Sequence, residues 1–165
     1  MKSIVTVEKL ADKLHLKPLY GLEYLDREIT TSEISRPGLE LAGYFNFYPA
    51  ERIQLLGRTE LSFAEQLSSR TRLKTMRRLC TPDTPCFVVS RKLLPPEELI
   101  EAAEEAKIPI LQASSRTTHV SSSVTNYLES RLAPRTSMHG VLVDVYGIGM
   151  LITGESGVGK SETAL

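Results

Sequence analysis

The sequence predicts an α/β domain with a largely parallel sheet, followed by a β-hairpin and a phosphate-binding loop. Two observations support this prediction. Between residues 51 and 132, short apolar runs with strand character alternate with amphipathic helical patterns, which is typical of a parallel sheet with crossover helices. Residues 150–161 then read MLITGESGVGKS, an apolar strand that leads into the pattern G-x-x-x-x-G-K-S.

The composition is that of an ordinary globular protein, with 41% hydrophobic and 24% charged residues among 165. Lys plus Arg and Asp plus Glu both number 20, and this balance argues against a nucleic-acid partner or a polybasic membrane surface. The N-terminus has no apolar core of signal-peptide length, and no run reaches the roughly 18 apolar residues of a membrane span. Cys80 and Cys86 fit no metal-binding spacing, so we expect reduced structural thiols in a cytoplasmic protein.

The first 50 residues predict a mixed set of short elements. A helix is expected over residues 7–15, with Thr6 as its cap, and a strand or irregular segment over residues 16–25. Residues 35–38 read SRPG, a turn signal. Residues 39–48 are rich in aromatic side chains, which suit either core and loop packing or a partner surface; we favour packing because no basic residues are interleaved.

Residues 51–132 carry the regular part of the pattern. One helix is expected after Thr59, with its apolar positions continuing to Met76. Ser62 and Glu65 offer a capping box if this helix begins slightly later. Two further helices are expected, one opened by the sequence PPEE at 95–98 and one beginning at Thr118. The strands are expected at residues 53–56, 86–89 and 108–111.

A run of basic residues lies on the helix expected after residue 59, namely Arg70, Arg72, Lys74, Arg77 and Arg78. It could form an anion or partner site, or a solvated helix face, and we favour the solvated face. The sequence APRTS at 133–137 interrupts the pattern and is interpreted as a linker between a domain at residues 1–132 and a second domain, of which residues 138–165 are expected to be only the start.

The glycine-rich pattern predicts a nucleotide site because its backbone N–H groups can surround phosphate oxygens. Lys160 is expected to reach the β- and γ-phosphates, and the Ser161 hydroxyl to ligate Mg²⁺. This backbone cradle reads phosphates and does not select a base. The predicted nucleotide-binding residues are Gly154, Glu155, Ser156, Gly157, Val158, Gly159, Lys160 and Ser161.

A hairpin is expected to bring His139 to this loop. Two β-rich runs flank the turn sequence GIG at 147–149, and a turn centred there places His139 opposite Ser156 or Gly157, about 5 Å away at Cα. An imidazole in this position could bind a phosphate oxygen or stabilise charge during transfer. The alternative is a histidine that only satisfies a backbone carbonyl, and we favour the functional role. His15 and His119 have no such surroundings in the sequence and are assigned to structure or surface.

The residues around the loop resemble the bacterial HPr kinase/phosphorylase family. The resemblance rests on HGVLVDVYG at 139–147 and GESGVGKSETAL at 154–165, with SRPGLELAGYF at 35–45 similar to that family's N-terminal domain. It implies a serine kinase that uses ATP or pyrophosphate with Mg²⁺ to phosphorylate HPr, the phosphocarrier protein of the sugar phosphotransferase system. It also implies the reverse phosphorolysis, which uses phosphate and yields pyrophosphate.

The same resemblance implies a role in carbon catabolite repression, a homo-hexamer assembled through the kinase domain, and an N-terminal domain similar to that of Mur ligases. The family's active-site histidine falls on His139 and its phosphate-loop lysine on Lys160. Its catalytic aspartate and second Mg²⁺ ligand fall beyond residue 165, so we expect these 165 residues alone to be inactive. The residues leave two alternatives open: another P-loop small-molecule kinase or ATPase, and a binding or assembly module.

Overall fold

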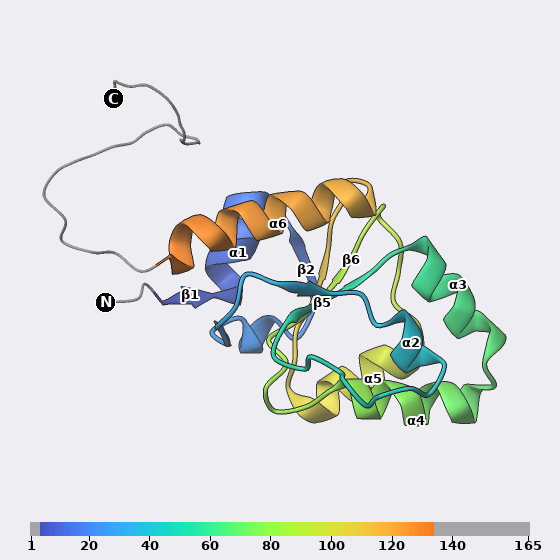
Figure 1. The fold of residues 1–165 in the computed structure, drawn as a ribbon. Helices are drawn as coiled ribbons and strands as arrows, with labels where there is room; N and C mark the ends of the chain where they lie inside the picture. Colours follow the sequence, from blue (N-terminus) through green and yellow to red (C-terminus); the bar gives the residue numbers. More distant parts are fainter. Residues whose placement is uncertain (1–3, 134–165) are drawn as a thin grey trace, which may run out of the picture. The chain divides into compact units, whose positions relative to one another are not determined.

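A computed structural model describes residues 4–133, which form a five-stranded sheet between two layers of helices (Figure 1). The strand order is β2-β7-β6-β5-β4, and β4 to β7 run parallel to one another. The predicted largely parallel sheet is therefore confirmed, with one addition: β2 pairs antiparallel with β7 at the edge. The strands are β2 (Lys17–Tyr20), β4 (Ile34–Ser35), β5 (Ile53–Leu56), β6 (Phe87–Val89) and β7 (Ile110–Gln112).

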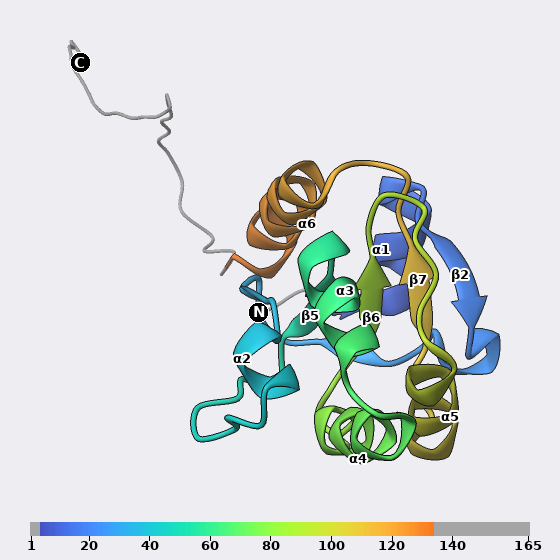
Figure 2. The same ribbon diagram turned by 90° about the vertical axis from the view of Figure 1, so that its right-hand side faces the viewer.

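Helices cover both faces of this sheet. Figure 1 shows α1 and α6 above the sheet and α4 and α5 below it, and Figure 2 shows the same arrangement from the side. A second, two-stranded sheet pairs β1 (Val5–Thr6) with β3 (Glu28–Ile29). The helices are α1 (Val7–Leu14), η1 (Leu22–Tyr24), α2 (Gly38–Leu41), α3 (Arg58–Gln66), α4 (Ser69–Leu79), α5 (Glu97–Ala106) and α6 (Thr117–Leu132).

The central strands are apolar at successive positions because both of their faces are buried. Leu55 pairs with Val88 and packs in the core shared with α1 and α6. Leu56 pairs with Val89 and packs in the core shared with α2 to α5. Successive side chains of a strand point to opposite faces, so a strand covered on both sides needs a continuous apolar run. This is why the sequence pattern identified these strands.

The single helix expected after Thr59 is wrong, because the segment forms two helices. Leu67 is extended (ψ 150°), which ends α3, and Ser68 begins α4 as its N-cap. The Ser68 hydroxyl accepts a hydrogen bond from the Thr71 backbone N–H at 3.2 Å. A serine at this position satisfies one of the free N–H groups of a helix start, so it favours a new helix over continuation of the old one.

The capping box expected at Ser62 and Glu65 is also wrong. The helix α3 already begins at Arg58, and the carboxylate of Glu60 accepts a hydrogen bond from the Gly57 backbone N–H at 2.7 Å. Ser62 lies inside the helix and its hydroxyl donates to the Thr59 carbonyl. The carboxylate three residues after the N-cap is thus in the expected relation to the helix start, but the pair is Gly57 and Glu60 in place of Ser62 and Glu65.

Other predicted helix starts hold within one residue. Thr6 caps α1, α5 begins at Glu97, and α6 begins at Thr117 rather than Thr118. The strand expected over residues 108–111 begins two residues later, at Ile110. Proline has no backbone N–H, so Pro109 contributes only its carbonyl, which accepts from Phe87.

The two edges of the main sheet are short or irregular. At one edge, β4 has two residues, Ile34 and Ser35. The predicted turn at residues 35–38 is instead a connection from this strand into α2, which begins at Gly38. At the other edge, the pairing of β2 with β7 shifts register between Pro18 and Tyr20.

Candidate functional site

The residues predicted to carry chemistry lie outside the described part of the chain. They are the phosphate-binding loop at residues 154–161, the hairpin before it, and His139 within that hairpin. Their proximity and their roles therefore stay predictions. Within residues 4–133, no three or more His, Cys, Asp and Glu side chains gather in a way that could hold a metal ion, and no helix is both long and apolar enough to cross a membrane.

The carboxyl ends of the parallel strands are the usual place for a ligand in such a sheet. In this domain the edge is filled beside β5 and β6. The hydroxyl oxygens of Ser90 and Thr117 lie 2.7 Å apart, and both residues are buried. A Cβ at Gly57 would lie 2.5 Å from the Thr117 Oγ1. This part of the edge therefore holds the N-terminus of α6 against the strands.

Charges next to this edge are also satisfied within the fold. The Arg36 guanidinium donates to the Glu60 carboxylate at 2.9 Å, and the same oxygen accepts from the Gly57 backbone N–H at 2.7 Å. The Glu60 side chain is 7% exposed. A buried carboxylate needs such partners, so we assign Arg36 and Glu60 to the structure of the connection between β4, β5 and α3.

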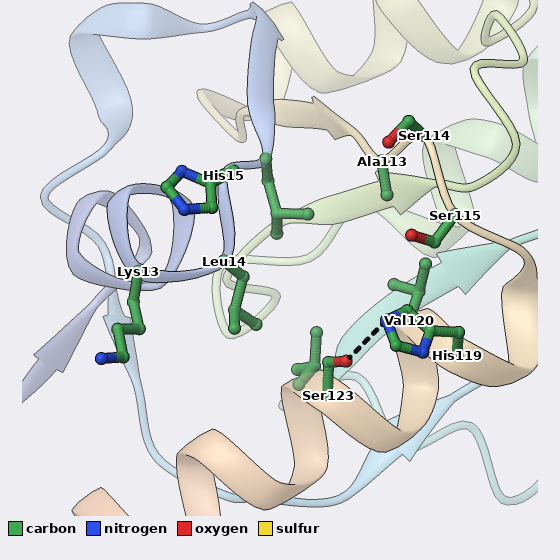
Figure 3. Close-up of a pocket in the computed structure, with 11 residues that line it drawn as sticks. Lys13, Leu14, His15, Ala113, Ser114, Ser115, His119, Val120 and Ser123 are labelled. Atoms are coloured by element: carbon green, nitrogen blue, oxygen red, sulfur yellow. Dashed lines mark hydrogen bonds between the residues drawn. The ribbon is translucent and has the colours of Figure 1, made fainter.

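An open pocket lies beyond β7, between α1 and α6 (Figure 3). Its volume is about 360 Å³. The end of α1 forms one side, the loop after β7 forms a second, and the first turns of α6 form the third. The lining residues are Lys13, Leu14, His15, Leu16, Ala113, Ser114, Ser115, His119, Val120, Ser123 and Val124.

Two histidines that are far apart in the sequence line opposite sides of this pocket (Figure 3). His15 is the residue after α1, in the left-handed conformation (φ 57°), and His119 is in the first turn of α6. The His119 Nε2 lies 3.4 Å from the Ser123 hydroxyl (Figure 3). No spacing rule connects positions 15 and 119, because only the packing of α1 beside α6 places them on one pocket.

The basic run on α4 is partly used in ion pairs with α5. The Arg72 guanidinium donates to both carboxylate oxygens of Glu98, at 2.8 and 3.2 Å. Hydrogen bonds from Arg72 and from the Ser69 hydroxyl lower the pKa of Glu98 to about 2. Arg72 also donates to the carbonyls of Ala64 and Leu67 at the end of α3. This arginine therefore joins three helices.

Two other members of the run also have partners. Arg77 pairs with Glu101 and Glu105 of α5, at 3.3 and 2.9 Å. The Arg78 guanidinium stacks over the Phe45 ring, 3.9 Å from its centroid, in a cation–π contact. These contacts favour a structural role for this helix face over an anion or partner site.

Some aromatic side chains of residues 39–48 pack against the core, and others are exposed to solvent. Phe45 and Tyr48 meet edge to face at 5.5 Å and pack against the core below the sheet. The Tyr48 hydroxyl donates to the Leu79 carbonyl at 2.6 Å. Tyr44 and Phe47 are 46% and 83% exposed. The favoured packing interpretation is thus confirmed for two of the four aromatic residues and wrong for the other two.

Comparison with known proteins identifies the class of both parts of the chain. Residues 5–128 match the family described as HPr Serine kinase N terminus, and residues 130–165 match the HPr Serine kinase C-terminal domain. The chain is therefore built like the HPr serine kinases, an α/β domain followed by the sequence of a kinase domain. It belongs to the HPr kinase/phosphorylase family.

Curated relatives agree along the whole chain. The HPr kinase/phosphorylase of Levilactobacillus brevis is 59% identical over 165 residues, covering 100% of this chain and 53% of the relative. That of a Geobacillus species is 58% identical over 161 residues, covering 98% of this chain and 52% of the relative. That of Listeria monocytogenes is 56% identical over 165 residues, covering 100% and 53%. The chain thus spans about half the length of these relatives.

A solved structure also overlaps the described fold. It is the crystal structure of the CBS and DRTGG domains of the regulatory region of Clostridium perfringens pyrophosphatase, complexed with the activator diadenosine tetraphosphate. The TM-score is 0.49 at 11% identity, over 78% of this chain and 50% of the other.

Proposed function

We propose that this chain supplies the N-terminal domain and the phosphate-binding loop of an enzyme that phosphorylates a regulatory serine of HPr and removes that phosphate by phosphorolysis. One observation carries the proposal. The sequences HGVLVDVYG and GESGVGKSETAL occur together at 139–147 and 154–165, within a chain that matches the kinase family from end to end. A phosphate-binding loop alone would support a much wider set of nucleotide enzymes.

In this proposal the residues of the second domain have separate roles. The N–H groups of residues 154–161 bind the phosphates of ATP or pyrophosphate, and Lys160 neutralises charge on them. Phosphate oxygens and the Ser161 hydroxyl are oxygen donors, which suit Mg²⁺ because it is a hard cation. The Ser161 hydroxyl is one of its ligands in this proposal. Bound Mg²⁺ would neutralise charge on the transferring phosphate. His139 stabilises the developing charge beside the loop.

The proposal also covers the organisation of the protein. We divide the chain into a domain at residues 1–132, a linker at 133–137, and the start of the kinase domain at 138–165. The end of α6 at Leu132, followed by Ala133 as its C-cap, supports the first boundary. The proposal includes cytoplasmic location, assembly into hexamers and control of catabolite repression.

The direct test uses the protein at the length of its relatives. Purified enzyme is incubated with ATP, Mg²⁺ and HPr, and then with inorganic phosphate and serine-phosphorylated HPr, and products are followed by mass spectrometry. We expect transfer in both directions. Lys160→Ala should lower kcat/KM by about 100-fold or more, since it removes a charge that stabilises the transition state. His139→Ala should lower turnover with less effect on nucleotide affinity.

Two outcomes would contradict the proposal. Phosphorylation of a small molecule in place of HPr would favour another P-loop kinase, and partner binding by residues 1–132 without transfer by the whole protein would favour a binding module. A polypeptide of these 165 residues alone is expected to show no transfer, because phosphoryl transfer needs an oriented nucleophile as well as a phosphate cradle. Detectable phosphorylation of HPr by that polypeptide would show that the base lies within it.

A further inference from the structure

The carboxyl edge of the main sheet carries an excess of positive charge. The four residues that follow each of the parallel strands β4 to β7 include five cations and one acid, Glu60. That acid is buried and already binds Arg36. The four residues that precede each of the same strands include two cations and three acids, so the excess belongs to one edge only. The five cations are Arg36, Arg58, Arg91, Lys92 and Arg116.

The connections that carry these cations contact one another. The backbone N–H of Arg91, after β6, donates to the carbonyl of Ser115, after β7, at 2.9 Å. Figure 2 shows these two connections side by side. After β5, a Cβ at Gly57 would lie 3.2 Å from the Arg36 Nη2 and 2.5 Å from the Thr117 Oγ1. The four connections therefore form one continuous surface.

Four of the five cations have no acidic partner within the fold. Arg58, Lys92 and Arg116 are exposed, and Arg91 is partly exposed. None of these four side chains takes part in an ion pair within residues 4–133, whereas Arg72 of α4 is held by Glu98. Their charges are therefore open to a group from outside the domain.

Local physical chemistry disfavours a cation at each of these four positions. Arg116 is the N-cap of α6 and Arg58 is the first residue of α3, and the positive end of a helix dipole favours acids in such places. Arg91 and Lys92 have φ 59° and 55°, in the left-handed region that favours glycine. The fold gives no reason for these cations, whereas a binding role does.

The width of the edge determines the kind of anion that fits it. Neighbouring strands lie about 4.8 Å apart, so the connections after four strands span about 14 Å. A single carboxylate or phosphate is too small to contact cations at both ends, and the ligand must carry several anionic groups. In an extended peptide, alternate side chains point the same way and lie about 7 Å apart, so acidic residues at alternate positions match this width.

We propose that this edge is a docking surface for an acidic segment of another protein, in which Arg58, Arg91, Lys92 and Arg116 pair with carboxylates. Three of these four side chains are arginines, whose planar fork binds a carboxylate through two parallel hydrogen bonds. The four residues after each strand include no Phe, Tyr or Trp, the side chains on which the bases of a nucleic acid stack. An acidic protein therefore suits the edge better than a nucleic acid.

The first experiment measures binding of an acidic peptide to the 165-residue chain. A fluorescein-labelled peptide of about ten glutamates, which is longer than the edge, is titrated and followed by fluorescence anisotropy. At about 0.15 M salt, where the Debye length is about 8 Å, we expect saturable binding that weakens as salt is added. A glutamine peptide of the same length should not bind. The proposal is overturned if the glutamate peptide shows no saturable binding, or if a thymidine oligonucleotide of equal charge binds as tightly.

Matched double variants separate this edge from general charge. Arg91→Gly together with Lys92→Gly removes two cations from the edge and suits the left-handed backbone. Arg70→Ala together with Lys74→Ala removes two exposed cations from α4. The first variant should weaken binding of the glutamate peptide about tenfold, and the second less than about twofold. Equal losses in the two variants would overturn the proposal.

A third variant tests the other end of the edge without harm to the helices. Arg58→Ala together with Arg116→Ser removes two cations, and serine is a better N-cap for α6 than arginine. We expect about a tenfold loss of peptide binding with an unfolding temperature at or above that of the parent. Unchanged binding in this variant would show that these arginines do not contact the peptide and would overturn their assignment.

A final comparison distinguishes another protein from a second copy of this chain, whose opposite sheet edge carries acids. The mass in solution of the parent and of the variant with Arg58→Ala and Arg116→Ser is measured by light scattering. We expect the two masses to be the same. Self-association of the parent that is lost in the variant would assign the edge to a second copy and overturn the proposal. Because the readouts are binding and mass, they are independent of whether the enzyme transfers phosphate to HPr.

Discussion

At Gly57 the surrounding atoms leave no space for a side chain. It follows β5, and a Cβ there would lie 2.5 Å from the Thr117 Oγ1 and 3.2 Å from the Arg36 Nη2. Thr117 cannot move away freely, because it is buried and shares a hydrogen bond with Ser90. The absence of a side chain at Gly57 therefore permits the close approach of α6 to the strands.

We expect Gly57→Ala to lower the free energy of unfolding by about 1–3 kcal/mol, since it forces atoms apart in a packed region. Urea denaturation of the 165-residue chain, followed by circular dichroism, measures the change. Gly38→Ala is the matched control, because a Cβ at Gly38 meets nothing within 4 Å and lies at the start of α2. Similar losses in both variants would show that steric crowding at Gly57 is not the cause.

At the scale of elements, the pairing of α4 with α5 depends on Arg72 and Glu98. Their side chains are 19% and 15% exposed, so the pair is shielded from water more than most surface pairs. Arg72 lowers the pKa of Glu98 from its ordinary value of 4.5 to about 2. A carboxylate with a lowered pKa stabilises the fold at any pH above its ordinary pKa, and this contribution is lost as the pH falls toward 2.

We expect Glu98→Gln to lower the free energy of unfolding by about 1–2 kcal/mol at pH 7, after allowance for the water that still reaches the pair. The difference between parent and variant should shrink between pH 5 and pH 2, which denaturation at a series of pH values would measure. Glu101→Gln, on the exposed side of α5, should have little effect at any of these pH values. A constant difference down to pH 2 would contradict the role given to Arg72.

At the scale of the whole molecule, Cys86 reports on the opening of the fold. It is fully buried in the core between the sheet and the layer of α1 and α6. Burial raises the pKa of its thiol to about 12, so at pH 8 the reactive thiolate is almost absent in the folded state. Reagents can reach this thiol only when the two layers separate.

We therefore expect iodoacetamide at pH 8 to modify Cys86 at least about 100-fold more slowly in buffer than in denaturing urea. The Cys80→Ser variant leaves Cys86 as the one thiol of the chain, and mass spectrometry follows its modification. Gly57→Ala should speed the reaction in proportion to its loss of stability. Modification of Cys86 in buffer at the rate seen in urea would mean that this core is open in solution.

The sequence-based predictions succeeded where the pattern is local. In β5, Leu55 and Leu56 are both apolar because the two faces of the strand are covered. The loop motif at 154–161 is also local in the sequence, but it lies outside the described residues and stays a prediction. The break between α3 and α4 was missed because Leu67 and Leu73 keep a helical spacing across it, with Ser68 as the sole signal. The direction of β2 and the placement of His15 and His119 on one pocket depend on contacts between distant elements, which no local pattern encodes.

The two edge strands of the main sheet affect whether copies of the protein aggregate. An exposed strand with free N–H and C=O groups invites another chain to add to it, which leads to aggregation. Here one edge strand, β4, is two residues long, and the other, β2, contains Pro18 and an irregular register beside it. Neither edge offers a regular row of unpaired backbone groups, so we expect this domain to stay dispersed at high concentration.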